Sequence, residues 1–480
     1  MRPVDRLSAL RRLLVLAAFG ALILLPTPVA LGVVAAMLAI SVARGARLLT
    51  RRRSAGGREG EIVLGVDRRG KLVRLGDSEL SAHGLILGAS GAGKTTTLLK
   101  ILSDQIGRGR PVIAIDMKGS PAFARELSAA AAAAGRPIKV WTIDGDAHWN
   151  PLAHGNATEL KDKLMATERF TEPHYQRAAE RYVQTVLQVL ARAHPGAPPT
   201  LHEVVALMDP RRLATVLRGL DRPDRERVQD YLAGLTHDQV SAIRGLQTRM
   251  AVLTESHTGP FLAPPAEAGA GAIDLRASVS GPEVVVFSLN SSSYGKLAAQ
   301  IGTLAVQDLV AASGDRLIER SRGRGVDQAV VAIDEFSALG ADHVIALLAR
   351  GRESGMTVLV ATQELADLER AAPGLKDQVL GVTAVKIAHR QEVPASALTI
   401  AQIAGTEEVW EETRQISGLF GGHSSGRGTR RLGERYIVHP NEIKGLRTGE
   451  AVVISKIRGI RPRTVRIEPP RRQPPPDLGR

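Results

Sequence analysis

A run of eight residues has the composition and spacing of a loop that binds phosphate. Residues 88–95 read GASGAGKT and fit the pattern G-x-x-x-x-G-K-[ST] at every fixed position, between a strand-like segment and the helix-like Thr96–Ser103. Glycines let backbone N–H groups surround phosphate oxygens at a helix N-terminus, Lys94 would neutralise the β- and γ-phosphates, and Thr95 would offer a hydroxyl to Mg²⁺. We therefore predict that ATP and Mg²⁺ bind to Gly88, Ala89, Ser90, Gly91, Ala92, Gly93, Lys94, Thr95 and Thr96.

A loop of this kind needs an acidic partner at the end of another strand, which holds the Mg²⁺ shell. The apolar segment Val330–Ile333 ends in Asp334 and Glu335. We predict that Asp334 is the metal ligand and that Glu335 is the general base for the attacking water. The segment Val112–Ile115 also ends in an aspartate, Asp116, but it lacks the second carboxylate. The pair at 334–335 is therefore the preferred interpretation.

Two further side chains are candidates because of where they follow predicted elements. Gln363 follows the apolar strand Thr357–Ala361, so its amide would lie near the other strand ends and sense the γ-phosphate. Arg350 and Arg352 lie on a predicted helix that starts near residue 342. In a ring of subunits, an arginine there would reach a neighbour's ATP as an arginine finger. A solvent-exposed glutamine and a helix-end arginine stabilised by the helix dipole are the alternatives.

The segments that would position these residues indicate an α/β protein with a parallel sheet. Apolar, β-branched runs alternate with helical stretches, and they resume after a long gap. The predicted strands are Ile62–Leu64, Leu85–Leu87, Val112–Ile115, Val140–Ile143, Val284–Phe287, Val330–Ile333, Val358–Val360, Val382–Ile387 and Ala451–Ile454. In the gap, apolar residues recur at helical spacing, as in Tyr182, Val183, Val186, Leu187 and Leu190. An all-helical domain is therefore expected to split the sheet.

This pattern divides the chain into five predicted parts. Residues 54–154 and 259–467 form the two halves of the ATPase core, and residues 155–258 form the helical insertion. Residues 1–53 form a membrane segment, and residues 468–480 form a Pro/Arg-rich tail with no apolar face to bury.

The composition excludes several kinds of site. The 480 residues contain no cysteine, so a disulfide scaffold, a CxxC zinc site and a thiol nucleophile are excluded. The net charge of +14 would suggest nucleic acid, but residues 1–53 carry +8 and residues 456–480 carry +6, so the body between them nets zero. The basic charge therefore fits an anionic membrane surface and a basic tail better than a DNA groove.

The apolar run Leu13–Val42 is interrupted by Pro26-Thr27-Pro28, which predicts a helical hairpin. Arginines flank the run on both sides, so both ends are expected in the cytoplasm, with the chain crossing the inner membrane twice. Each arm has about 14 residues, or about 20 Å of helix, against a hydrocarbon core of about 30 Å. A signal peptide or a single kinked span is the alternative.

Taken in order along the chain, the motifs resemble the type IV secretion coupling proteins of the TraG/TraD kind. The motifs that carry the resemblance are GASGAGKTT, AIDMKG at 114–119, WNPL at 149–152, AIDEF, ARGRESG, ATQ and the C-terminal RYIVHPNEIKGLRTGEAVV at 435–453. The resemblance implies a RecA-like P-loop NTPase core with an inserted all-helical domain and an N-terminal transmembrane hairpin. It also implies that Lys94 and Thr95 bind nucleotide and Mg²⁺, that Asp334 and Glu335 form the Walker B pair, that Gln363 is the sensor, and that Arg352 acts in trans.

The resemblance further implies a homo-hexameric ATPase at the inner membrane that pumps DNA, together with a relaxase, into a conjugative secretion channel. Single-stranded DNA gripped by its phosphates, relaxosome proteins and inner-membrane secretion components are the partners implied. A HerA/FtsK-like DNA translocase and a protein-exporting secretion ATPase are the alternatives. A membrane docking receptor with a vestigial loop is disfavoured by the intact acidic pair, and a soluble nucleotide kinase is disfavoured by the hairpin.

Overall fold

The computed structural model describes residues 60–168, 170, 172–265, 271–325, 327–339, 341–417 and 423–470. The predicted membrane hairpin at 1–53 lies outside the described residues, as does the predicted tail from residue 471 onward. Within the described ranges, no helix combines the length and apolar character that a membrane crossing requires.

The core is one sheet of eleven strands in the order β2-β1-β13-β12-β9-β3-β8-β7-β4-β6-β5. The strands are β1 (Glu61–Asp67), β2 (Leu72–Gly76), β3 (Gly84–Leu87), β4 (Val112–Asp116), β5 (Ile138–Thr142), β6 (Val284–Ser288), β7 (Ala329–Asp334), β8 (Met356–Thr362), β9 (Val385–Ala388), β12 (Glu450–Ser455) and β13 (Arg463–Ile467). Every residue of β3, β4, β6, β7, β8 and β9 is buried, as expected for central strands covered on both faces.

The expectation of a purely parallel sheet is wrong at one side. All pairs from β9 through β3, β8, β7, β4 and β6 to β5 are parallel. In contrast, β12 pairs antiparallel with β9 and β13, and β1 pairs antiparallel with β13. Only seven residues connect β12 to β13, which is too few for the crossover that parallel neighbours need. The fold is therefore α/β with a mixed sheet.

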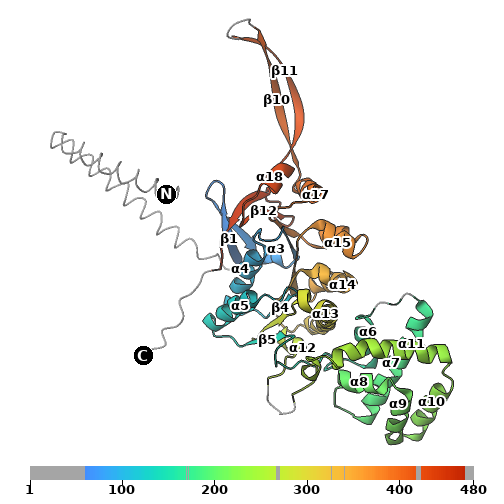
Figure 1. Cartoon of the computed structure of the whole chain (residues 1–480). Coiled ribbons are helices and arrows are strands. Elements are labelled where there is room, and N and C mark those ends of the chain that lie inside the picture. Colours follow the sequence, from blue (N-terminus) through green and yellow to red (C-terminus); the bar gives the residue numbers. More distant parts are fainter. Residues whose placement is uncertain are drawn as a thin grey trace, which may run out of the picture. The chain divides into compact units, whose positions relative to one another are not determined.

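Helices cover both faces of the sheet, with α4 and α5 on one face and α13, α14 and α15 on the other (Figure 1). The helices of this core are α3 (Asp77–Leu80), α4 (Lys94–Gly107), α5 (Pro121–Ala133), α12 (Leu275–Ser278), α13 (Ser291–Ser321), α14 (Ala341–Gly351), α15 (Leu365–Ala371), α16 (Leu375–Val382), α17 (Pro394–Ala404) and α18 (Pro440–Lys444). The sheet thus forms the middle of three layers, and the carboxyl ends of its parallel strands share one edge.

The elements described between β5 and β6 are all helical. Besides α12, they are α6 (Ala157–Met165), α7 (Pro173–Ala193), α8 (Leu201–Leu207), α9 (Pro210–Val216), α10 (Arg222–Ala233), α11 (His237–Thr254) and two short helical turns. The apolar stripe of α7, from Tyr182 to Leu190, is buried against its neighbours. The WNPL segment connects this part to the sheet, because Trp149 packs edge-on to Phe287 of β6 and the Asn150 side chain donates to the Pro199 carbonyl at 3.1 Å.

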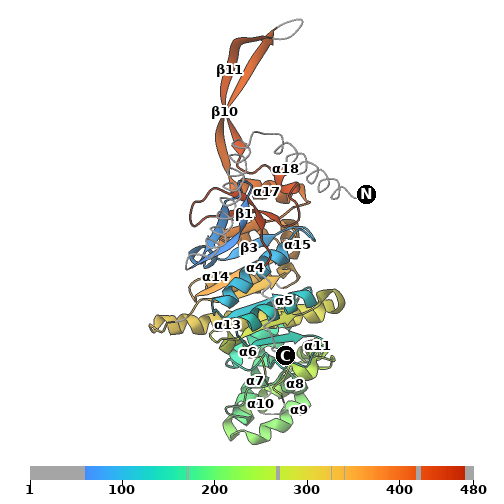
Figure 2. The same cartoon turned by 90° about the vertical axis from the view of Figure 1, so that its left-hand side faces the viewer.

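A second sheet consists of two long antiparallel strands, β10 (Thr406–Ser417) and β11 (His423–Tyr436). The pairing runs from Thr406 opposite Tyr436 to Ser417 opposite His423, with one register shift near Arg414. Figures 1 and 2 show this pair as a ribbon that leaves the core next to α17 and α18. Neither strand was predicted from the sequence. We refer to residues 406–417 and 423–436 as the ribbon.

Candidate functional site

The glycine-rich loop lies between the buried strand β3 and the helix α4, at the carboxyl edge of the parallel strands. Two glycines adopt left-handed backbone conformations there, Gly91 with φ +72° and Gly93 with φ +119°. Such values strain any residue with a side chain, so glycine is the residue that allows this turn. Gly93 caps α4, which directs the first free N–H groups of that helix toward the loop. The loop therefore has the shape of an anion cradle.

Lys94 folds back over this cradle. Its side chain is 96% buried, and its Nζ donates hydrogen bonds to the carbonyl oxygens of Gly88 and, at 3.5 Å, of Ala89. Burial lowers the pKa of Lys94, and the positive charge of Lys118 lowers it further. A polyanion in the cradle would counter both effects, because it would surround the ammonium with negative charge.

A neutral histidine lies against the start of the loop and the first turn of α4. His389 follows β9, and its Nδ1 lies 2.9 Å from the carbonyl oxygen of Glu450 while its Nε2 lies 2.8 Å from Thr97 Oγ1. Burial lowers the pKa of His389 to about 4, so near pH 7 the ring is neutral, with Nδ1 donating and Nε2 accepting. A Cβ on Gly88 would come within 2.6 Å of the His389 Cβ. His389 was not predicted as a site residue, although it lies two residues after the predicted strand Val382–Ile387.

The acidic pair lies beside the loop. Asp334 ends β7, which is separated from β3 by one strand, and its Oδ2 accepts from Thr95 Oγ1 at 3.4 Å. Asp334 is 2% exposed, and its Oδ1 has no hydrogen-bond partner among the described residues. A hydroxyl and an unsatisfied carboxylate oxygen facing a phosphate cradle fit the oxygen ligands that Mg²⁺ prefers. The residues present therefore suit a Mg²⁺–nucleotide complex.

Glu335 holds an unusual backbone conformation, with φ +59° and ψ 45°. A left-handed glutamate is rare and costs about 1 kcal/mol or more, so this strain is a feature often found at functional sites. The conformation turns the chain out of β7 immediately after Asp334.

Asp116, the rival aspartate, lies on the strand next to β7, with its Cα opposite that of Asp334. Its carboxylate is engaged by its own turn, accepting from the backbone N–H of Lys118 at 3.0 Å and of Ser120 at 2.6 Å. Burial raises the pKa of Asp116 to about 6, although the two N–H donors lower it. The neighbouring turn thus satisfies Asp116, whereas Asp334 keeps an oxygen free.

The turn after Asp116 brings a cation to the acidic pair. Lys118 Nζ lies 2.9 Å from Glu335 Oε2 and 3.8 Å from Asp334 Oδ2. Burial alone would lower the pKa of Lys118, but the two carboxylates raise it overall. Lys118 belongs to the AIDMKG motif but was not predicted to act in the site, because β4 and β7 are far apart along the chain.

Gln363 lies next to the loop, as its position after β8 suggested. Its backbone carbonyl oxygen accepts from the backbone N–H of Gly88 at 3.2 Å. The preceding Thr362 is fully buried, with its hydroxyl 3.3 Å from Ser337 Oγ. The end of β8 is therefore fastened directly to the start of the cradle.

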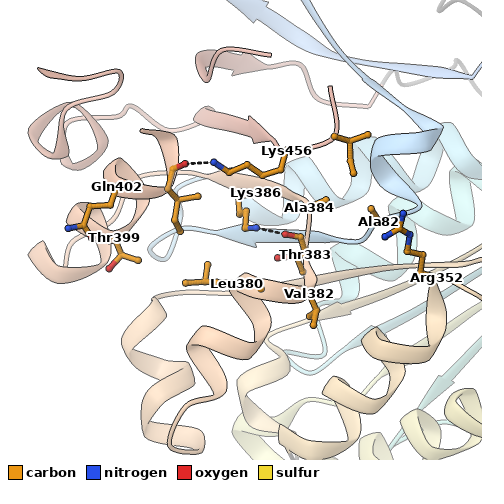
Figure 3. Close-up of a pocket in the computed structure, with 13 residues that line it drawn as sticks. Ala82, Arg352, Leu380, Val382, Thr383, Ala384, Lys386, Thr399, Gln402 and Lys456 are labelled. Carbon is orange, nitrogen blue, oxygen red and sulfur yellow. Dashed lines mark hydrogen bonds between the residues drawn. The ribbon is translucent and has the colours of Figure 1, made fainter. Parts of the chain in front are cut away.

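Arg352 lies at the opposite edge of the sheet. It lines a pocket of about 640 Å³ together with Ala82, which precedes β3, and Ala384, which precedes β9 (Figure 3). The loop begins at the other end of β3. The four residues of this strand separate the loop from the pocket by about 13 Å. Arg352 and the loop of one chain therefore do not form one site.

Two lysines share this pocket with Arg352. Lys456 Nζ donates to the Ile403 carbonyl at 2.7 Å, and Lys386 Nζ donates to the Thr383 carbonyl (Figure 3). Burial, and to a lesser degree the charge of Lys456, lowers the pKa of Lys386 to about 8. The side chains of Lys386 and Lys456 are thus tied to backbone oxygens, whereas Arg352 is exposed.

The Lys118 ion pair leads to a testable prediction about the nucleotide-free protein. Lys118→Met leaves two adjacent carboxylates without their counter-charge, so the melting temperature is expected to fall by about 2–4 °C. Addition of Mg²⁺ and ADP should close most of that gap, because the divalent cation supplies the missing charge. Differential scanning fluorimetry with and without Mg²⁺–ADP measures both values. Lys376→Met, which breaks a surface pair with Asp377, is the matched control. An equal loss with and without Mg²⁺–ADP would contradict the idea.

Comparison with protein families identifies one matching model. Residues 328–448 match the family described as the TraM recognition site of TraD and TraG. This range contains the acidic pair, Arg352, Gln363 and the ribbon. A search of curated protein sequences gave no match.

Several solved structures share the fold. The conjugative coupling protein TrwBΔN70, in its unbound monoclinic form, has a TM-score of 0.61 at 15% identity, covering 86% of this chain and 90% of that chain. Plasmid coupling protein TrwB in complex with ADP and Mg²⁺ has a TM-score of 0.60 at 14% identity, covering 88% and 91%. VirB4 of Thermoanaerobacter pseudethanolicus has a TM-score of 0.54 at 16% identity, covering 86% and 97%.

The two kinds of comparison agree. The family model matches the part of the chain that contains the C-terminal motifs, and the fold likeness extends over most of the chain. The resemblance of this chain to the type IV secretion coupling proteins is therefore confirmed.

Proposed function

We propose that this chain is an ATP-hydrolysing coupling motor that delivers DNA into a conjugative type IV secretion channel. The observation that carries the proposal is the contact between Thr95 of the glycine-rich loop and Asp334 at the end of β7, which brings the two predicted Mg²⁺ ligands together on a fold shared with TrwB. The match of residues 328–448 to the TraM recognition site supports a relaxosome protein as a partner.

The residues of this site have separate roles in the proposed reaction. Bound Mg²⁺–ATP supplies a phosphoanhydride bond whose hydrolysis releases free energy. Lys94 and the N–H groups of the loop hold phosphate charge, and Thr95 and Asp334 hold the cation. A Glu335 oxygen accepts a proton from the attacking water. Lys118 Nζ lies 2.9 Å from Glu335 Oε2, so a cation stands beside the proposed base.

The working assembly that we propose is a membrane-anchored homo-hexamer. The anchor rests on the apolar run Leu13–Val42 with its flanking arginines. The ring rests on Arg352, which lies at the edge of the sheet remote from its own loop and would serve the ATP of the next subunit. Gln363, whose backbone touches the loop, would report the γ-phosphate to the neighbouring strands. The cargo would be single-stranded DNA, gripped by its phosphates without base readout.

ATP turnover with and without single-stranded DNA tests this function. The full-length chain is expected to release phosphate several-fold faster when DNA of mixed sequence is present, because the motor performs work on the strand. Lys94→Ala is expected to abolish turnover and also plasmid transfer in cells, while the protein still reaches the membrane. Transfer that persists in the Lys94→Ala cells would refute the motor role.

The same assay separates the alternative functions. A protein-exporting ATPase is expected to respond to an unfolded polypeptide and not to DNA. A HerA/FtsK-like translocase would respond to double-stranded DNA and would be dispensable for conjugation. Stimulation by DNA combined with a loss of transfer is the result that favours the coupling protein over both.

A further inference from the structure

The ribbon is a two-stranded sheet whose outer edges lack a partner among the described residues. Its strands have 12 and 14 residues, and each is paired only with the other. Ion pairs fasten its base, where Glu407 contacts Arg435 at 3.3 Å and Arg461 at 2.6 Å. An isolated two-stranded ribbon is marginally stable in water, and its open edges invite another strand. The ribbon therefore has the properties of an unfinished sheet.

The two strands carry opposite charge. The sequence of β10, TEEVWEETRQIS, has four glutamates and one arginine and so a net charge of −3. The sequence of β11, HSSGRGTRRLGERY, has four arginines and one glutamate and so a net charge of +3 with its histidine neutral. The strand at one edge of the ribbon therefore has a net negative charge and the strand at the other edge a net positive charge, and most of both charges lies in the half nearer the core.

One face of the ribbon also carries an apolar pair. Trp410 lies directly opposite Leu432, and the two are 58% and 46% exposed. The Arg430 guanidinium lies 5.3 Å from the centre of the Trp410 ring. A directly opposed aromatic and aliphatic pair at the surface of a ribbon gains stability when a further strand covers it.

We propose that the ribbon pairs with the ribbons of neighbouring copies, β11 of one copy against β10 of the next. This inference rests on the ring proposed above, in which a rotation axis relates the copies. Rotation about an axis along the ribbon places β11 antiparallel to the next β10, as in a continuous antiparallel sheet. Each acidic strand then lies between two basic strands.

The charge pattern selects this arrangement over the two-fold alternatives. A two-fold pairing would place β10 against β10 or β11 against β11, and both bring together strands of like net charge. Head-to-tail pairing places glutamates against arginines at every junction, and it closes when the rotation closes. The pairing also leaves no strand edge unpaired. Closed barrels avoid unwanted pairing with other chains in the same way. The ring would then carry a collar of strands beside the ATPase core.

The absence of cysteine makes a cross-linking test direct. One preparation of the full-length chain carries Glu411→Cys on β10 and a second carries Arg431→Cys on β11, so neither has an intramolecular partner. Mixed copies treated with a short bismaleimide are expected to give cross-linked dimers of the two types in high yield. Asp238→Cys, exposed on α11 of the helical part, measures chance collision. Cross-linking of the Glu411→Cys copies with each other, or a mixed yield no higher than the collision control, would overturn the proposal.

A charge exchange provides an independent test. Glu408→Lys with Glu411→Lys makes both strands basic, and Arg430→Glu with Arg431→Glu makes both acidic. Each variant alone is expected to lose protection from hydrogen exchange at the alternate amides that point to the open edges, with about tenfold weaker pairing between copies. The mixture should regain it, because basic and acidic ribbons then alternate. Protection that appears only with anionic lipid vesicles would assign the ribbon to a membrane and overturn the proposal.

The outcome is separable from the proposed function. A ring that hydrolyses ATP in a DNA-stimulated manner, but shows neither the cross-link nor the rescue by mixing, contradicts the collar and leaves the motor intact. A cross-link without ATP turnover contradicts the motor and leaves the collar intact.

Discussion

Glu335→Gln is expected to lower ATP turnover by about two to four orders of magnitude while leaving nucleotide binding almost unchanged. The amide cannot accept the proton of the attacking water. It has the same size as the carboxylate, so the left-handed backbone at φ +59° experiences no new strain. Its carbonyl oxygen can still accept from Lys118 Nζ, which lies 2.9 Å from the native carboxylate. The substitution therefore isolates proton transfer from folding.

Two measurements on the same protein check this result. Phosphate release under saturating ATP gives the turnover, and titration with a fluorescent ATP analogue gives the affinity. Glu226→Gln, at an exposed position of α10 where the glutamate pairs with Arg222, is the matched control and should leave both values unchanged. Turnover within tenfold of the native rate would show that another group accepts the proton. A loss of affinity equal to the loss of turnover would assign Glu335 to binding.

The parts of the site that the sequence predicted are those encoded locally. The glycine spacing of 88–95 determines a turn between a strand and a helix, and the loop lies there. The acidic pair and Gln363 each follow an apolar strand, and the carboxyl ends of parallel strands meet at one edge of a sheet. Sequence position was therefore enough to place Asp334 and Gln363 beside the loop. The parallel pairing of β3, β8 and β7 brings the carboxyl ends of these strands together.

The residues that sequence reasoning missed depend on the order of the strands, which no local pattern contains. Lys118 reaches Glu335 only because β4 lies next to β7, and His389 supports Gly88 only because β9 lies next to β3. Both contacts join segments that are far apart along the chain. The antiparallel side of the sheet has another origin, the seven-residue connection from β12 to β13, where β13 was not predicted as a strand.

The ribbon was missed for a different reason. Strand prediction relies on alternating or continuous apolar residues, and β10 and β11 contain mostly charged and small polar ones. Half-buried strands show alternation because one face meets a core. Of the described ribbon residues, only Tyr436 at its base packs against the core, so the pattern that identifies other strands is absent from most of the ribbon.

The remaining question about the site is whether Arg352 acts on its own chain or on a neighbour, and mixing two inactive variants answers it. Arg352→Ala is expected to lower turnover by about a thousandfold or more if it is an arginine finger. Lys94→Ala removes the cation of the loop. Because Arg352 lines the pocket near Ala82 while the loop begins at Gly88, the two side chains belong to opposite edges of one sheet. One nucleotide could contact both only if they come from different copies.

Co-assembled rings of Lys94→Ala and Arg352→Ala copies are therefore expected to hydrolyse ATP faster than either variant alone. At equal amounts, about one quarter of the head-to-tail interfaces would join an intact Lys94 to an intact Arg352, so turnover should recover to a comparable fraction of the native rate if sites act independently. Arg350→Ala, in the last turn of α14 and two residues before Arg352, should keep near-native turnover by itself. A mixture no more active than its components would show that Arg352 does not complete a neighbour's site. The exposed position of Arg352 in its pocket would then not mark a subunit interface.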